Sequence, residues 1–509
     1  MVIISSAQVI GLDATIINIE VDLSPGLHIF SIVGLADKEV QESRERISVA
    51  IKNLGARSPH KKSERLIVNL APADIKKEGP AFDLPIALGY LLASGQARFD
   101  PKGRLFAGEL GLDGSLRPIS GVLAMAIVAR LAGFQTIYVP LGNGSEASLV
   151  DGLTIKESPS LQAILDDLEG KRELPLVQKM ISPEAIDPPD VIDFALIHGQ
   201  EQAKRAIEIA AAGGHNLLMH GPPGTGKTIL ARAIPGVLPP MTHDEIIEVT
   251  KIFSIAGLLR SEIPLMQTRP FRSPHHSASA VAITGGGSAI RPGEVTLAHR
   301  GVLFLDELPE FPAHILNSLR QPLEDRTITI ARASGAVSYP ADFMLVAAMN
   351  PCPCGNLTNP IQSCICSPGA LAKYQRRVSG PLLDRIDLHI EVAGLAADKL
   401  VHHDDSRTSE SDAMRERIAG ARDRQRERFQ KESIGTNSAM TIKELKQYCR
   451  LDESSRDILK QAYERFGMSV RSYYRMIKLA RTIADLTGAA DIQSGHLLEA
   501  FQYRPKVGT

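Results

Sequence analysis

The stretch NLLMHGPPGTGKT at residues 216–228 decides the fold, because it joins an apolar strand to a helix through a glycine-rich turn. This order is typical of a nucleotide-binding βα unit. Glycines let backbone N–H groups surround the β-phosphate, a lysine reaches the β and γ oxygens, and a final hydroxyl binds Mg²⁺. A chance glycine turn is the alternative, and the correct flanks argue against it. The predicted ATP-binding residues are Gly221, Pro222, Pro223, Gly224, Thr225, Gly226, Lys227 and Thr228.

Two adjacent carboxylates follow a second apolar strand at 302–305. We predict that Asp306 holds Mg²⁺ together with Thr228, and that Glu307 orients and deprotonates the attacking water. The alternative is that the pair caps a helix expected near 310–319. Neither carboxylate can compensate the charge on the γ-phosphoryl group, so the candidates for that role are several arginines and Asn350, at the end of a third strand over 343–349.

Four of the five cysteines form two Cys-x-Cys pairs after the third strand. In a reducing compartment this cluster points to metal before disulfide. Four thiolates in two close pairs can close a tetrahedral zinc site, which would be structural because no open ligand position is evident. Free or partly paired thiols are the alternative, since the pairs have a single spacer residue. The predicted zinc ligands are Cys352, Cys354, Cys364 and Cys366.

The composition is that of a globular protein with about three domains, since 44% of its 509 residues are hydrophobic and 23% are charged. A net charge of -1 excludes a uniformly basic coat for nucleic acid, although a local basic channel would not show in this sum. The apolar stretches around 84–93 and 122–129 are too short to cross a bilayer. Without a secretory signal at the start, we expect a cytoplasmic protein with no membrane partner.

The chain divides into four predicted regions. Residues 1–170 alternate strands near 1–10, 15–23, 65–72 and 136–140 with helices over 38–54, 83–94 and 122–132, which predicts an α+β domain. A proline-rich stretch over 171–192 is a predicted linker, and 193–397 a predicted α/β ATPase core. Residues 398–509 are predicted as a charged helix and a helical domain, with Asp452 and Asp491 as helix caps. The arginines over 415–428 allow two interpretations, a solvated face or a nucleic-acid contact.

Several motifs together resemble a known family. They are DFALIHGQ (193–200), PFRSPHH (270–276), GVLFLDELPEF (301–311), AAMNPCPCG (347–355), GPLLDRIDLH (380–389) and SVRSYYRMIKLARTIADL (469–486). Over essentially the whole chain they resemble the AAA+ ATPases of the magnesium-chelatase-like branch, and within it the ComM/YifB family. The resemblance implies a P-loop AAA+ core with a helical C-terminal lid, assembled into rings that are usually hexamers. It implies three further catalytic residues: Asn350 as sensor 1, Arg385 as an arginine finger for the neighbouring subunit, and Arg471 as sensor 2.

Two further segments are candidates for contact with DNA. Residues 283–292 (ITGGGSAIRP) correspond, by the resemblance, to the helix-2 insertion of the related clade. Residues 325–342 alternate around a turn at 333–335, which predicts a β-hairpin, and by the resemblance this hairpin lines the pore of the motor. The region from 260 to 300 carries five arginines and no lysine, for which surface charge or pairing between subunits is the alternative. The predicted DNA-contacting residues are Arg291 and Arg332.

The N-terminal domain resembles the Lon protease domain, which has a ribosomal-S5-like fold. Segments 70–88 and 111–126 are similar to those that carry the catalytic serine and lysine there, but this sequence has Ala81 and Leu123 at those positions. A methyl group cannot attack a carbonyl and a leucine cannot act as a base. We therefore predict an inactive protease domain that serves as a scaffold, binds DNA or arranges the ring.

The resemblance favours a hexameric, ATP-driven DNA motor, a helicase or branch-migration translocase that acts in natural transformation and homologous recombination. Its expected cofactors are ATP, Mg²⁺ and zinc, and its expected partners are single-stranded and branched DNA and recombination proteins. The alternative is a chelatase-type motor that remodels a partner protein during metal insertion, although the chelatase motor subunit is expected to resemble only residues from about 190 onward. A third possibility, an ATP-dependent protease, is opposed by Ala81 and Leu123.

Overall fold

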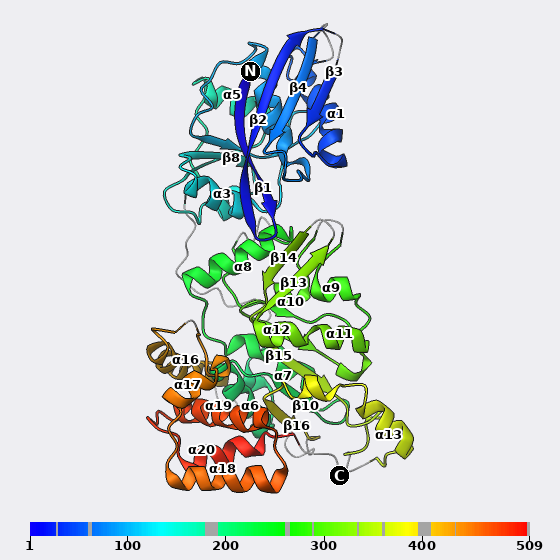
Figure 1. The fold of residues 1–509 in the computed structure, drawn as a ribbon, viewed down its shortest axis with the longest axis vertical. Helices are drawn as coiled ribbons and strands as arrows, with labels where there is room; N and C mark the ends of the chain where they lie inside the picture. The colour runs from blue at the N-terminus through cyan, green and yellow to red at the C-terminus, as the bar shows by residue number, and fades with distance from the viewer. Residues whose placement is uncertain are drawn as a thin grey trace. The chain divides into compact units, whose positions relative to one another are not determined.

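The computed structural model describes residues 1–26, 29–59, 64–178, 192–259, 265–287, 290–332, 335–358, 362–394, 409–432 and 434–505. The chain forms two compact units, which are coloured by residue number in Figure 1. The first comprises Met1–Glu184 and His243–Met266, and the second comprises Ala185–Thr242 and Gln267–Thr509. The chain therefore leaves the second unit for the first and returns. Within the described ranges, no helix has both the length and the apolar character that crossing a bilayer requires.

A seven-stranded sheet in the order β3-β4-β2-β1-β5-β8-β9 forms the centre of the first unit. β1 and β2 run antiparallel, from Val2 opposite Val21 to Ile10 opposite Asp13, whereas β5, β8 and β9 are parallel. Buried residues alternate with less buried ones along β4, because successive side chains point to opposite faces. The strands are β1 (Val2–Ile10), β2 (Asp13–Pro25), β3 (Ile29–Val33), β4 (Glu64–Ala71), β5 (Arg104–Phe106), β8 (Thr136–Pro140) and β9 (Thr154–Ser158), with a separate pair β6 (Glu109–Leu110) and β7 (Leu116–Arg117).

Helices cover this sheet. α2 is buried over nearly its whole length, and it approaches the sheet closely at Gly89, where a Cβ atom would lie 2.6 Å from Cγ2 of Val21. A fifth long helix of this unit, α8, comes from the middle of the sequence and packs on α3. The helices are α1 (Lys38–Asn53), α2 (Asp83–Ala93), α3 (Val122–Leu131), α4 (Gly144–Ala147), α5 (Leu161–Leu168) and α8 (His243–Ile255).

The second unit is built on a five-stranded parallel sheet in the order β11-β12-β15-β10-β16. β10 lies between β15 and β16, with Leu217 opposite both Val346 and Leu388. Because the carboxyl ends of parallel strands meet at one edge, the residues that follow β10, β12 and β15 come together there. The strands are β10 (Leu217–His220), β11 (Phe271–Arg272), β12 (Val302–Leu305), β15 (Met344–Met349) and β16 (Leu388–Glu391).

Short helices and a hairpin surround this sheet. The predicted hairpin is present as β13 (Thr327–Arg332) and β14 (Gly335–Pro340), which pair antiparallel from Thr327 opposite Pro340 to Arg332 opposite Gly335. Its turn residues 333 and 334 lie outside the described ranges. The helices are α6 (Glu201–Gly213), α7 (Lys227–Ala233), α9 (Ala280–Thr284), α10 (Glu294–Leu297), α11 (Ala313–Ser318), α12 (Arg320–Asp325), α13 (Pro368–Gln375) and α14 (Gly380–Leu383).

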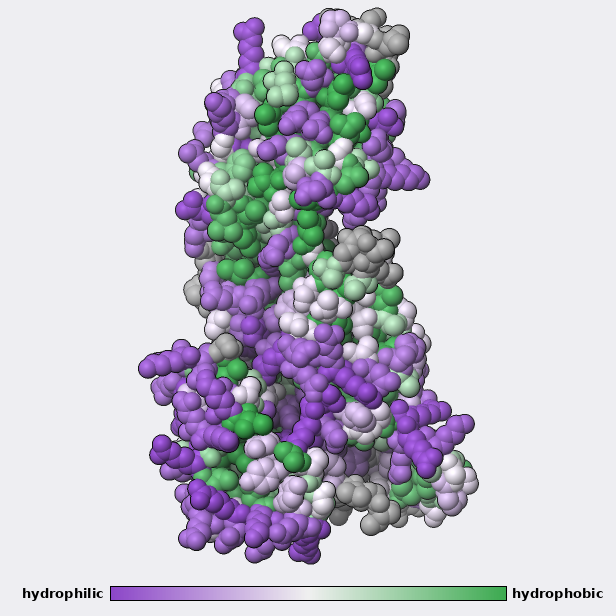
Figure 2. Space-filling model, in the orientation of Figure 1, coloured by the Kyte–Doolittle hydropathy of each residue, from purple (hydrophilic) through white to green (hydrophobic). Residues whose placement is uncertain are grey.

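The C-terminal region is helical, as predicted. Asp452 caps α18 by accepting a hydrogen bond from the backbone N–H of Ser455. The prediction of Asp491 as a cap is wrong, because α20 begins later and Gln493 and His496 form a capping box there. Hydrophilic side chains cover the outer side of α18 in Figure 2. The helices are α16 (Glu410–Arg428), α17 (Ile442–Tyr448), α18 (Glu453–Phe466), α19 (Val470–Leu486) and α20 (Ser494–Gln502).

Candidate nucleotide site and its surroundings

The predicted phosphate-binding loop connects β10 to α7. Gly224 and Gly226 have φ angles of +77° and +91°, a region that glycine adopts without steric cost. Gly221 passes close to the chain that follows β16, since a Cβ atom there would lie 2.1 Å from the carbonyl oxygen of Val392. The backbone of this loop therefore requires glycine at all three positions.

Lys227 points back into the loop. Its Nζ atom donates to the carbonyl oxygens of Gly221 (2.7 Å) and Pro222 (2.8 Å) and lies 3.2 Å from Oδ1 of Asn350. Burial lowers the pKa of Lys227, and the charge of Asp306 acts in the opposite direction. The tertiary structure thus brings the loop lysine and Asn350 together, because β15 lies beside β10 in the sheet.

The two predicted magnesium ligands also meet. Thr228 Oγ1 donates to Oδ2 of Asp306 at 2.8 Å, while Oδ1 of the same carboxylate accepts the backbone N–H of Glu307 at 2.9 Å. A hydroxyl and a carboxylate are among the oxygen ligands that Mg²⁺ binds, beside the phosphates of a nucleotide. This pair therefore fits Mg²⁺ next to Lys227.

Glu307 has a neighbour that was missed in the sequence. Its backbone has a φ of +50°, which is uncommon outside glycine, and its side chain is 55% exposed. Nδ1 of His276 lies 3.3 Å from Oε2 of Glu307. His276 belongs to the PFRSPHH motif, which contains β11, and β11 lies parallel to β12. The signal available in the sequence was a histidine pair after a short strand, but the pattern does not reveal which strand is adjacent.

Arg385 and Arg471 lie in a separate cluster. Nη2 of Arg385 lies 2.7 Å and Nη1 of Arg471 lies 2.6 Å from the same atom, Oε1 of Glu324 on α12. Arg385 also donates from Nη1 to the carbonyl oxygen of Pro381 at 2.5 Å. Within one chain, the two arginines thus share one acceptor, Oε1 of Glu324. Glu324 is a second residue that was missed in the sequence.

The four cysteines of the loop between β15 and α13 are close together, with one sulfur atom from each within 4.8 Å of the others. Sγ of Cys352 lies 3.4 Å from that of Cys354 and 3.7 Å from that of Cys364, and the last two are 3.6 Å apart. A tetrahedral zinc ion with Zn–S bonds of about 2.3 Å holds its sulfurs about 3.8 Å apart. Hydrogen bonds from the backbone N–H groups of Asn356 and Ile365 lower the pKa of Cys354 to about 6, whereas burial and the neighbouring sulfurs raise the pKa of Cys364 and Cys366. The distances between the sulfur atoms fit zinc.

The cysteine loop lies against the nucleotide site. Gly355 has a φ of +81°, and a Cβ atom there would lie 2.5 Å from Cδ of Pro223 in the phosphate-binding loop. The backbone of Asn350 also hydrogen-bonds Tyr374, on the helix that follows the cysteines. A metal in this loop would therefore support both the phosphate-binding loop and Asn350.

The two segments predicted to contact DNA lie side by side. The hydroxyl of Tyr339 on β14 donates to the carbonyl oxygen of Ile290 at 2.7 Å, so the hairpin is bonded to the described part of the 283–292 segment, from which residues 288 and 289 are excluded. Arg291 is exposed, and Arg332 ends β13. Of the other arginines between 260 and 300, Arg260 lies outside the described ranges, and the rest bond within the chain: Arg269 to the carbonyl oxygens of Pro239 and Arg300, Arg272 to Glu294, and Arg300 to Asp342.

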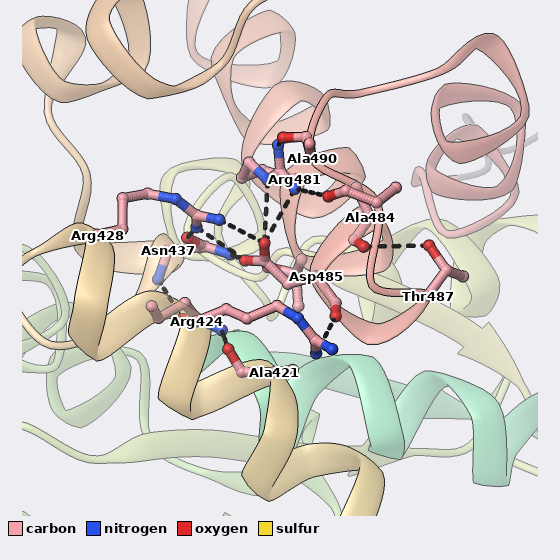
Figure 3. A network of polar contacts seen from close by, with 12 residues as sticks. Ala421, Arg424, Arg428, Asn437, Arg481, Ala484, Asp485, Thr487 and Ala490 are labelled. Carbon is pink, nitrogen blue, oxygen red and sulfur yellow. Dashed lines mark hydrogen bonds and ion pairs between the residues drawn. The ribbon is translucent and has the colours of Figure 1, made fainter.

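The arginines of α16 form most of their hydrogen bonds and ion pairs with groups of the same chain. Oδ1 of the buried Asp485 accepts from Arg428 (2.5 Å) and Arg481 (3.0 Å), and Oδ2 accepts from Asn437 (2.7 Å), as Figure 3 shows. This network joins α16 to α19. The remaining arginines of the run also have partners: Arg415 with Gly236 and Asp412, Arg417 with Glu208, Arg422 with Ala211, Arg424 with the carbonyl of Asp485, and Arg426 with Asp423. The solvated-face interpretation therefore suits half-exposed Arg417 and Arg426, but not Arg428.

The two positions predicted to correspond to the catalytic serine and lysine of a protease domain are buried in the first unit. Ala81 is 8% exposed in the turn before α2, and Leu123 is fully buried in the first turn of α3. Leu123 packs against Leu149 and against Leu265, which belongs to the segment His243–Met266. The position that resembles the catalytic lysine is therefore covered by a segment from the middle of the chain.

Hydrogen bonds hold that segment on the first unit. The buried carboxylate of Glu146 accepts from the hydroxyl of Ser254 and, at 3.2 Å, from the backbone N–H of Leu123. The backbone N–H of Gly121 donates to the carbonyl oxygen of Ser254 at 3.2 Å, and Lys251 pairs with Asp13 at 2.7 Å. Burial raises the pKa of Glu146, and the hydrogen bond from Ser254 opposes this.

Comparison with known proteins defines the class. Residues 193–400 match the family described as magnesium chelatase, subunit ChlI, residues 408–504 match the C-terminal region of that subunit, and residues 19–143 match the family described as subunit ChlI of Mg-chelatase. With the parallel sheet, the phosphate-binding loop and the helical C-terminal region, these matches define a magnesium-chelatase-like P-loop AAA+ protein. This class indicates an ATPase that uses ATP and Mg²⁺ and assembles into oligomers.

Relatives that span the whole chain narrow the assignment. The competence protein ComM of Haemophilus influenzae is 42% identical over 100% of this chain and 98% of its own length. The uncharacterized protein YifB of Escherichia coli is 40% identical over 99% of this chain and 96% of its own length. The chain belongs to the ComM/YifB family.

Chelatase subunits match a smaller part. The magnesium-chelatase 67 kDa subunit of Heliobacterium mobile is 30% identical over 32% of this chain and 28% of its own length. The expectation that the chelatase resemblance begins only near residue 190 is wrong, because residues 19–143 match a family described as a chelatase subunit.

Proposed function

We propose that this chain is the subunit of a hexameric, ATP-driven DNA motor that acts by branch migration in natural transformation and homologous recombination. The meeting of Lys227, Thr228, Asp306 and Asn350 at one edge of the parallel sheet carries the proposal, since it provides the groups that bind ATP and Mg²⁺. Glu307 beside this pair activates the attacking water. The name of the 42% identical relative, a competence protein, supports the biological setting.

In this proposal the DNA passes the hairpin β13–β14 and the 283–292 segment. The two segments are joined by the hydrogen bond from Tyr339 to Ile290, so they present one surface. The side chain of Arg291 is exposed and has no partner among the described residues, which leaves its charge available for phosphate contacts. Arg332, next to the hairpin turn, is the second proposed contact.

Each of the four predicted regions has a role in the proposed motor. Residues 193–397 form the ATPase core and 398–509 the lid, while 1–170, joined by the linker 171–192, form an inactive protease-like scaffold. Arg385 completes the ATP site of the neighbouring subunit and Arg471 acts from the lid. Recombination proteins are further partners, and the motor works in the cytoplasm.

Zinc is the third proposed cofactor. The sulfur distances of 3.4 to 3.7 Å are close to those of a tetrahedral site, and the donors come from one loop that packs on the phosphate-binding loop. When bound, zinc supplies a cross-link for that loop and takes no part in hydrolysis.

The decisive experiment is a junction assay. Three-stranded and four-way DNA junctions are incubated with the purified protein and ATP beside a simple duplex, with Glu307→Gln as the inactive control. Conversion of the junctions by the wild-type protein alone supports the proposal. ATP hydrolysis that ignores single-stranded and branched DNA but responds to chelatase subunits would favour the alternative of a motor for metal insertion.

A further inference from the structure

Arg385 is held from both sides by its own lid helix, α19. Nη1 of Arg475 donates to the carbonyl oxygens of Ile386 (2.8 Å) and Asp384 (3.3 Å), the two residues that flank Arg385. Arg475 is 4% exposed, so this contact is part of the interior. Bonds from one buried guanidinium to both flanking carbonyls fix the backbone that carries Arg385.

Glu324 provides the second connection. Arg471 lies one helical turn before Arg475, on the same face of α19, and shares the Oε1 atom of Glu324 with Arg385. The lid helix therefore contacts the backbone of the Arg385 segment through Arg475, and it is linked to the Arg385 side chain through Arg471 and the shared carboxylate of Glu324.

A third connection enters on the other side of the segment. Asp387 accepts the backbone N–H of Asn216 at 3.2 Å and lies 3.3 Å from Nδ1 of His215. Nε2 of His215 in turn lies 2.8 Å from the hydroxyl of Thr482, which is again on α19. The Arg385 segment is thus bonded both to α19 and to the core, where Asn216 donates to the carbonyl oxygen of Arg385 at 2.9 Å, so a displacement of α19 must strain or break contacts on both sides of Arg385.

Arg385 itself is incompletely bonded. Its side chain is 13% exposed, yet its buried Nε atom finds no partner among the described residues. An unsatisfied buried donor is costly, and within the described part of the chain Nε of Arg475 is unpaired in the same way, so both guanidinium groups keep a donor without an acceptor.

We propose that Glu324 and Arg475 are positioning residues. They tie Arg385 to the lid helix of its own chain and so determine where its guanidinium group lies at the ATP site of the next subunit. This inference rests on the proposed function, in which Arg385 acts across the subunit interface and Arg471 acts from the lid. Movement of the lid on ATP binding in one subunit then changes hydrolysis in the next.

Glu324→Gln tests this proposal, because the amide keeps the size of the side chain but removes the charge that holds both arginines. We expect kcat to fall about 10- to 100-fold, since a misplacement of about 1 Å can cost about 10²-fold. KM for ATP should change by less than about twofold, and the Hill coefficient for ATP should approach one. Arg475→Lys should behave in the same way. The matched control is Glu410→Gln, a similarly exposed carboxylate in an ion pair with Lys204, which should leave all three values unchanged.

Mixing subunits separates positioning from a structural role. A Glu324→Gln subunit keeps its own Lys227 site, and a Lys227→Ala neighbour offers it a correctly held Arg385, so mixed rings should regain ATPase activity. Absence of recovery, or normal turnover and Hill coefficient for Glu324→Gln alone, overturns the inference. The proposed shared site fails separately if Arg385→Ala alone is fully active.

Discussion

Nδ1 of His276 lies 3.3 Å from Oε2 of Glu307, the carboxylate that we assign to activation of water. The histidine ring is also packed against Phe311, with ring centroids 6.3 Å apart, which limits its movement. A fixed partner of this kind restricts the orientation of the exposed carboxylate of Glu307.

Replacing His276 by alanine should lower kcat about tenfold and leave KM for ATP nearly unchanged, because a positioned general base contributes about 10²- to 10⁴-fold and only its orientation is lost. Steady-state ATPase kinetics measure both values. The control is His275→Ala, since the ring of His275 packs on that of His276 but bonds Ser277 instead. An equal loss in both variants would mean that packing of the histidine pair matters for folding.

Lys227→Ala and Glu307→Gln should stop the ATPase at different steps. The first removes the ammonium group that binds phosphate oxygens, so nucleotide binding should be lost. The second should bind ATP and keep the assembled ring without turnover. Binding of a fluorescent nucleotide, size by light scattering and phosphate release distinguish them, and normal hydrolysis by Glu307→Gln would refute its assignment as the base.

Arg385→Ala should be inactive alone and partly rescued by Lys227→Ala protein. In mixed rings an intact Lys227 site can face an intact Arg385, and an arginine supplied in trans is worth about 10³- to 10⁵-fold in GTPases. The readout is ATPase activity as a function of the mixing ratio. If Arg385 only served its ion pair with Glu324, its loss would lower the stability of the fold and leave the ATPase activity intact.

Zinc should be present at about one per chain in protein purified without chelators. Cys352→Ser should lose the metal and lower the melting temperature, because bound zinc stabilises the folded state of its loop. The control is Cys449→Ser, a buried cysteine that contacts Met440 and lies outside the cluster, so its zinc content should be normal. Metal analysis that finds no zinc in the wild-type protein would contradict the assignment.

Leu265→Ala should destabilise the first unit by about 2–5 kcal/mol, since it leaves a cavity against Leu123 and Leu149. Hydrogen exchange of residues 243–266 should increase at the same time. Leu258→Ala, in the same segment but 45% exposed, should change stability by less than about 0.5 kcal/mol. Equal exchange in the two variants would show that Leu265 does not anchor the segment.

The wild-type protein should have no peptidase activity on casein.

Most elements of the fold could be predicted from the sequence. The strands β10, β12 and β15 carry unbroken apolar runs, the hairpin has strict alternation, and Asp452 stands before an apolar helical pattern. These signals are local, because they depend on side chains a few residues apart. The prediction of Asp491 as a cap was wrong because a second local signal lies close by. The capping box of Gln493 and His496 starts the helix two residues later.

The sequence by itself predicted the nucleotide chemistry, because the loop 221–228 and the pair Asp306–Glu307 each carry their reactive groups within a few residues after an apolar run. Only the tertiary structure showed that these strand ends share one sheet edge. The tertiary structure alone decided the contacts of His276, Glu324 and Leu123. Each of these depends on which distant segment becomes a neighbour, and that is set by burial of apolar surface over the whole unit. A polar residue on a short helix leaves no periodic signal in the sequence, so its partners become visible only when the chain is folded.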